Sequence, residues 1–114
     1  MTLLLRMTTL REEVMMQIEI AGQKALLEWQ YFWDDDTDGY QWVTTRAVLR
    51  GDAKDNREPI AFEEAICSPR DKFVKDTGRK ISLARLLKAM GLSREQRRDV
   101  WNQYHARKVS NGHG

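Results

Sequence analysis

The sequence predicts one α+β domain, with an antiparallel β-meander over residues 12–67 and two helices over residues 69–90 and 93–108. Three observations favour this architecture. Apolar and polar residues alternate through the first two-thirds of the chain, turn-forming runs separate the alternating segments, and helical periodicity with capping residues begins at Ser68. A chain of 114 residues that is 41% hydrophobic and 32% charged has the composition of a globular protein with a modest core.

The strands follow from the alternation and from the turns between them. Tyr40 to Arg50 is the most strand-like run, and the acidic loop DDDTDG before it closes a hairpin. Trp29, Tyr31 and Trp33 share one face of the preceding strand, so Phe32 lies on the other and leaves an aromatic surface for a partner or ligand. The expected strands are residues 13–20, 24–33, 40–50 and 60–67, with loops at 34–39 and 51–59.

Two serines mark the expected helix starts. Ser68 precedes Pro69 and lies three residues before Asp71, which is the arrangement that satisfies the first amides of a helix. Ser93 with Gln96 repeats the capping pattern after Gly91, the expected end of the first helix. Residues 109–114 are expected to form a flexible tail.

Gly78 interrupts the first helix at a cost of about 1 kcal/mol relative to Ala, which needs a reason such as close backbone approach. The spacing predicts a core-facing stripe of Phe73, Thr77, Ile81 and Ala84, and an opposite basic row of Lys72, Lys75 and Arg79. Such a row can bind phosphates, Arg through its planar fork and Lys as a point charge.

Charge is divided unevenly along the chain. Residues 1–68 carry 7 Lys and Arg against 13 Asp and Glu (−6), whereas residues 69–114 carry 12 against 4 (+8). This asymmetry indicates a nucleic-acid, nucleotide or acidic-protein partner for the basic half, or pairing of the two halves within a chain or across a dimer. The small core and the aromatic hairpin also favour self-association as a dimer or larger oligomer.

Little in the sequence indicates catalysis or a metal. Asp34, Asp36, Asp38 and Gly39 match the start of a calcium loop, but Thr45 occupies the position of its bidentate Glu, so a solvated turn is the better interpretation. The two histidines are His105 and His113, and no phosphate-binding Gly-rich loop or metal-ligand spacing is present. We therefore expect a protein that is not an enzyme and has no cofactor, no catalytic residues and no metal site.

The single cysteine and the absence of a long apolar run or leader sequence favour the cytoplasm, with Met1 or Met7 as the start.

The segment from Cys67 to Arg85 has the pattern C-S-P-x-D-x-F-x-K-x-x-G-R-K-I-x-L-x-R. It resembles the C-terminal helix of phage anti-Thoeris proteins, oligomeric cages that sequester cyclic ADP-ribose isomers without cleaving them. The resemblance covers about 24 of the 114 residues. It implies a phage anti-defence protein in the host cytoplasm, with Lys75, Arg79 and Arg85 on phosphates and Phe73 or a hairpin aromatic on adenine.

The predicted ligand-binding set is therefore Lys72, Phe73, Lys75, Arg79 and Arg85, and the predicted partner is a small nucleotide. DNA binding is the second hypothesis, because LLKAMGLSREQRRDVW has the form of a helix-turn-helix, although Arg97 takes a position where that motif prefers an apolar residue. A protein-directed inhibitor of a host defence complex is the third. A membrane partner is not expected.

Overall fold

The computed structural model describes residues 9–51 and 59–111, with side chains described from Met15 to Gly51 and from Pro59 to Ala106. The alternative starts Met1 and Met7, His113 and most of the loop over residues 51–59 lie outside the described residues. Within them the predicted α+β fold is confirmed, since four antiparallel strands precede two helices.

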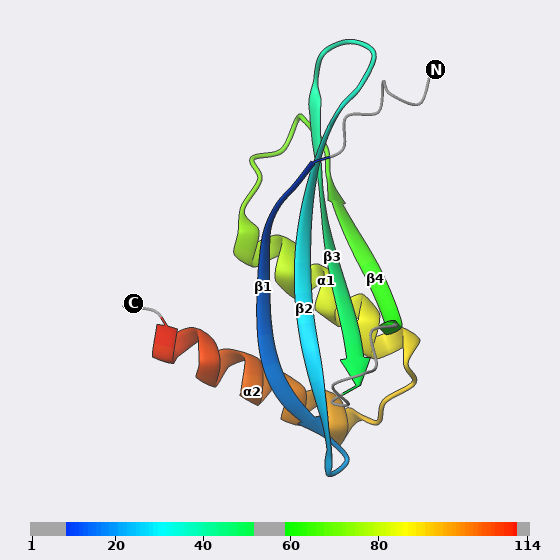
Figure 1. The fold of residues 1–114 in the computed structure, drawn as a ribbon, viewed down its shortest axis with the longest axis vertical. Helices are drawn as coiled ribbons and strands as arrows, with labels where there is room; N and C mark the ends of the chain where they lie inside the picture. Colours follow the sequence, from blue (N-terminus) through cyan, green and yellow to red (C-terminus); the bar gives the residue numbers. More distant parts are fainter. Residues whose placement is uncertain (1–8, 52–58, 112–114) are drawn as a thin grey trace.

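The strands form one sheet in the order β1-β2-β3-β4, as a meander requires (Figure 1). Their bounds are Thr9–Ile20 for β1, Gln23–Asp35 for β2, Gln41–Gly51 for β3 and Pro59–Cys67 for β4. Ala21 and Gly22 make the tight turn between the first two strands, and both have positive φ (53° and 80°). The sheet begins three residues earlier than the predicted residue 12.

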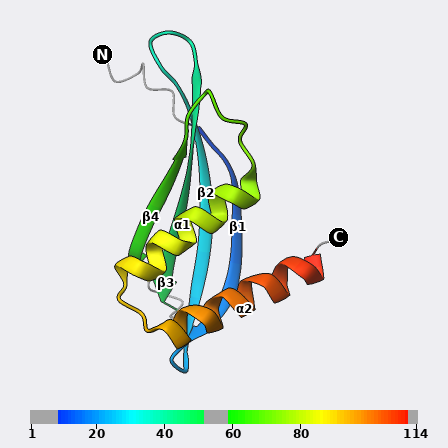
Figure 2. The ribbon, with the colours of Figure 1, turned by 180° about the vertical axis from the view of Figure 1, so that it is seen from behind.

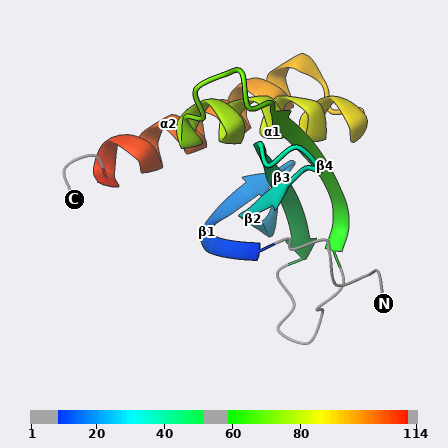
Figure 3. The same cartoon turned by 90° about the horizontal axis from the view of Figure 1, so that it is seen from above.

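Both helices, α1 (Lys75–Ala89) and α2 (Arg94–Asn111), lie on the same face of the sheet and cross it diagonally (Figures 2 and 3). The core therefore lies between that face and the helices. Alternate residues of the strands supply the sheet side of the core, among them Leu27, Trp29 and Tyr31. The helices supply the other side with Leu83, Leu86, Leu87, Val100 and Tyr104. Neither helix is long and apolar enough, within the ranges that the structure describes, to span a membrane.

The first helix begins at Lys75, six residues later than predicted. Ser68 Oγ accepts the Arg70 amide at 3.3 Å and donates to Asp71 Oδ2 at 3.3 Å, so the capping residues close a turn instead of starting a helix. Val74 is extended (φ −126°, ψ 120°) and precedes the helix without a side-chain cap. This extended stretch carries Phe73 onto the sheet, where its ring packs against Tyr31 and Trp33.

The second capping prediction is confirmed. Ser93 Oγ accepts the Gln96 amide at 3.1 Å, and the Gln96 side chain accepts the Ser93 amide at 2.9 Å. The helix then continues to Asn111, three residues past the predicted end, so the predicted tail is in part helical.

The predicted core stripe on α1 is wrong except for Phe73, which lies before the helix. Thr77, Ile81 and Ala84 are exposed, and the residues buried against the sheet are Ser82, Leu83, Leu86 and Leu87. The helix is rotated because Gly78 faces β3: a Cβ built on Gly78 would overlap Thr45 Oγ1 and lie 3.1 Å from Thr45 Cβ. The backbone of α1 therefore approaches β3 closely at Gly78, where it meets the side chain of Thr45.

Replacing Gly78 by Ala should destabilise the protein, although Ala is the better helix former. The overlap with Thr45 forces α1 away from the sheet, and overpacking of this kind costs about 1–3 kcal/mol. We expect a lower midpoint of urea unfolding with an unchanged slope.

A second substitution, Thr45→Ala, should recover part of this loss because it removes Oγ1, the atom that the new methyl group meets. That hydroxyl is buried without a hydrogen-bond partner, so its removal adds little cost of its own. A Gly78→Ala variant as stable as the parent protein would contradict the close approach.

Candidate functional site

Tyr31 on β2 brings together three of the five predicted ligand-binding residues. Its hydroxyl accepts a hydrogen bond from Arg79 Nη1 at 2.7 Å, and its ring centroid lies 5.6 Å from Lys75 Nζ. Its ring also contacts Phe73 edge-on, with 6.2 Å between centroids. We call Tyr31, Phe73, Lys75, Asp76, Arg79 and Tyr104 the Tyr31 cluster.

Arg79 is held on several sides within this cluster. Its Nε donates to the Tyr104 hydroxyl at 3.3 Å, and its Nη2 lies 3.9 Å from Asp76 Oδ1. Burial alone would lower the pKa of the guanidinium, but the hydrogen bonds to the two tyrosines raise that pKa above its ordinary value. Arg79 is therefore a fixed, permanently charged group with a structural role in addition to any role in binding.

Tyr104 links the two helices through the same cluster. Its hydroxyl donates to Asp76 Oδ1 at 2.7 Å while it accepts from Arg79. Burial raises the pKa of the phenol, and the bond to Asp76 raises it further against the opposing effect of Arg79. The phenol therefore stays protonated at neutral pH and can donate to the carboxylate.

Several charged side chains lie around Tyr31. Among the residues whose side chains are described, Lys75, Arg79 and Lys80 lie near the carboxylate of Asp76, which pairs with Lys80 at 3.1 Å. Trp33 and Phe73 lie beside them with their rings 6.0 Å apart at 80°, and both are only partly buried. This combination can attract an anion next to an aromatic surface.

The structure does not bring Lys72 and Arg85 into the cluster. Lys72 is exposed in the segment before α1, so the predicted helical row of Lys72, Lys75 and Arg79 does not exist as a row. Arg85 lies at the edge of the sheet, where its Nη1 donates to the Glu64 carbonyl at 2.9 Å.

Two members of the cluster were not recognised from the sequence. Neither Tyr104 nor Asp76 belongs to the ligand-binding set predicted from the sequence. The four-residue spacing of Asp76 and Lys80 is a visible sign of a helical ion pair. The contacts of Tyr104 with Asp76 and Arg79 span 28 and 25 residues and leave no local sequence signal.

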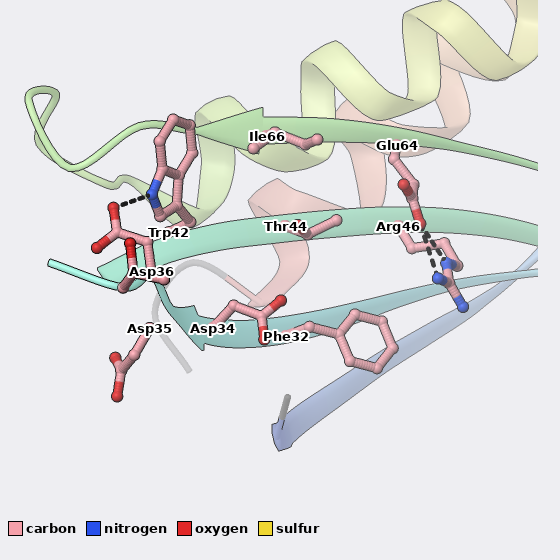
Figure 4. Close-up of a pocket in the computed structure, with 10 residues that line it drawn as sticks. Phe32, Asp34, Asp35, Asp36, Trp42, Thr44, Arg46, Glu64 and Ile66 are labelled. Carbon is pink, nitrogen blue, oxygen red and sulfur yellow. Dashed lines mark hydrogen bonds and ion pairs between the residues drawn. The ribbon is translucent and has the colours of Figure 1, made fainter. Parts of the chain in front are cut away.

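The opposite face of the sheet carries a wide groove of about 880 Å³ (Figure 4). Phe32 lies on this open face, as predicted from the alternation, and Trp42 and Arg46 of β3 lie there too. Arg46 pairs with Glu64 at 2.7 Å and lies 4.8 Å from the centroid of the Phe32 ring. The groove also has acidic lining from Asp34, Asp35 and Asp36, which disfavours a phosphate there.

The acidic loop is a turn organised by Asp36. Its Oδ1 accepts the Asp38 and Tyr40 amides, both at 2.9 Å, and its Oδ2 accepts the Trp42 indole N–H at 2.9 Å. The Trp42 bond is the largest cause that lowers the pKa of Asp36 below its ordinary value. No group of three His, Cys, Asp or Glu that could hold a metal ion occurs among the described residues.

Comparison with known proteins gives no assignment. No protein-family model matches the chain, and no curated protein or solved structure matches it significantly.

Replacing Tyr104 by Phe should lower the free energy of unfolding by about 1–2 kcal/mol, because Asp76 loses a donor and Arg79 an acceptor in a half-buried site. Thermal unfolding measures the loss. Tyr40→Phe is the matched control, since Tyr40 is 61% exposed and the same change should have no measurable effect. Equal melting temperatures for the parent and Tyr104→Phe would mean that the phenol does not fix Arg79.

Proposed function

We propose that the protein binds and retains a small phosphate-bearing nucleotide signal at the Tyr31 cluster, without cleaving it. The observation that carries the proposal is the gathering of Lys75, Arg79 and Phe73 around Tyr31, which places two cations beside aromatic rings. The partly buried rings of Trp33 and Phe73 offer a surface for a base. The resemblance of residues 67–90 to the phage anti-Thoeris proteins supports the same class of ligand and an anti-defence role.

The proposed contacts differ from those expected from the sequence. Lys75 and Arg79 are the phosphate-binding groups, whereas Lys72 and Arg85 lie outside the cluster of a single chain. Arg79 also holds Tyr31 and Tyr104, so an Arg79→Ala variant would lose stability along with any ligand contact. Lys75, whose Nζ lies 5.6 Å from the centroid of the Tyr31 ring, is the second probe.

Calorimetry of the purified protein against cyclic ADP-ribose isomers, cyclic dinucleotides and duplex DNA, each at two salt concentrations, tests the proposal. We expect stoichiometric uptake of one nucleotide class, with the nucleotide recovered intact after denaturation. Lys75→Gln should weaken that binding about 10- to 100-fold, since a charge-assisted contact contributes about 1.5–3 kcal/mol.

Lys88→Gln is the matched control, because it removes the same charge from an exposed position in the last turn of α1. An equal loss of affinity in both variants would show that the cluster is not the site. Binding to duplex alone, with a steep fall as salt rises, would replace the proposal by DNA binding. No binding to any of these ligands would favour a protein-directed inhibitor.

A further inference from the structure

β4 is an edge strand with one neighbour in the described sheet, β3. Its nine residues therefore present one side of their backbone N–H and C=O groups away from the sheet. One described contact on this side is the Arg85 side chain, which donates to the Glu64 carbonyl at 2.9 Å. This contact shows that the Glu64 carbonyl points away from β3. Because backbone groups alternate along a strand, those of Phe62 and Ile66 point the same way.

Exposed apolar side chains gather on both sides of this edge. Of the eight large hydrophobic residues exposed in the described part of the chain, three lie in β4: Ile60 (58%), Phe62 (52%) and Ile66 (60%). Val74 and Ile81 add two more across a groove of about 240 Å³ that α1 forms with β4, and Ile66 also lines that groove. An edge strand flanked in this way is a template for pairing with another strand.

The sequence of β4 indicates what kind of strand can pair with this edge. Residues 60–66 read Ile-Ala-Phe-Glu-Glu-Ala-Ile, which is nearly the same in both directions. Antiparallel pairing of two identical strands about Glu63 places Ile60 opposite Ile66 of the second copy, and Ala61 opposite Ala65 of the second copy. In a two-fold dimer each residue meets its mirror position, so the near-symmetry of β4 brings isoleucine against isoleucine and alanine against alanine.

We propose that β4 pairs antiparallel with β4 of a second copy, about a two-fold axis at Glu63, to form a continuous eight-stranded sheet. In this register Phe62 and Glu64, whose backbone groups point outward, form the central hydrogen-bonded pairs once Arg85 releases the Glu64 carbonyl, which then accepts the Phe62 amide of the second copy. The two Glu63 side chains meet at the axis. Arg85 of each copy lies beside them, since Arg85 and Glu63 line the same surface hollow, and offsets their repulsion.

Multi-angle light scattering at tens of micromolar protein tests the assembly, with Ile66→Lys as the test variant and Met15→Lys as its matched control. Both residues are exposed, so neither change should disturb the core, and circular dichroism checks the fold. Met15 lies on β1, at the opposite edge of the sheet. We expect twice the chain mass of 13.4 kDa for the parent and Met15→Lys proteins, and the single mass for Ile66→Lys.

Oxidative cross-linking tests the register. In a Cys67→Ala background, Glu63→Cys should form a disulfide-linked dimer, because opposed residues on paired strands have Cα atoms about 4.5–5.5 Å apart. Glu95→Cys, exposed on α2, should not. A monomeric parent protein, equal dissociation by Met15→Lys, or a dimer in which Glu63→Cys does not cross-link would each overturn the proposal.

Discussion

The contact between Gly78 and Thr45 determines how the helical layer sits on the sheet. Thr45 lies directly opposite Tyr31 in the register of β2 and β3, and α1 approaches this pair most closely where it lacks a side chain. The next residue, Arg79, then reaches the Tyr31 hydroxyl at 2.7 Å. The missing side chain of Gly78 thus allows the close approach that brings the Arg79 guanidinium to the Tyr31 hydroxyl. The other residues of the Tyr31 cluster lie around this hydrogen bond.

The sequence was sufficient for the architecture because strands and turns are specified locally. Alternation placed Trp29 and Tyr31 on one face and Phe32 on the other, as the structure has them. The capping pattern was less decisive, since a similar arrangement of side chains starts α2 at Ser93 but closes only a turn at Ser68. The two serines differ in their tertiary contacts. After Ser68, packing of Phe73 on Tyr31 and Trp33 keeps the chain extended up to Val74, so the helix starts later.

The candidate site could be predicted only in part, for a related reason. The excess of Lys and Arg and the interruption at Gly78 were visible in the sequence, and they pointed to α1, the helix that carries Lys75 and Arg79. The rotation of α1 was not visible, because it depends on Thr45, 33 positions earlier on β3. Arg79 was therefore assigned to a ligand alone, although two tyrosines from other elements hold it, and Arg85 was assigned to a phosphate although it reaches the sheet edge.

The proposed nucleotide binding and the proposed strand pairing would place opposite demands on the same positive charge. Residues 75–111 carry ten Lys and Arg against three Asp and Glu, a surplus of seven on the helical side of the sheet. A two-fold axis perpendicular to the sheet keeps both helical layers on one side, so dimerisation adds the two surpluses and their repulsion opposes it. Salt screens that repulsion but also screens the attraction for a phosphate. Assembly and ligand affinity should therefore respond to salt in opposite directions, because apolar contact stabilises the β4 edge while charge attracts the nucleotide.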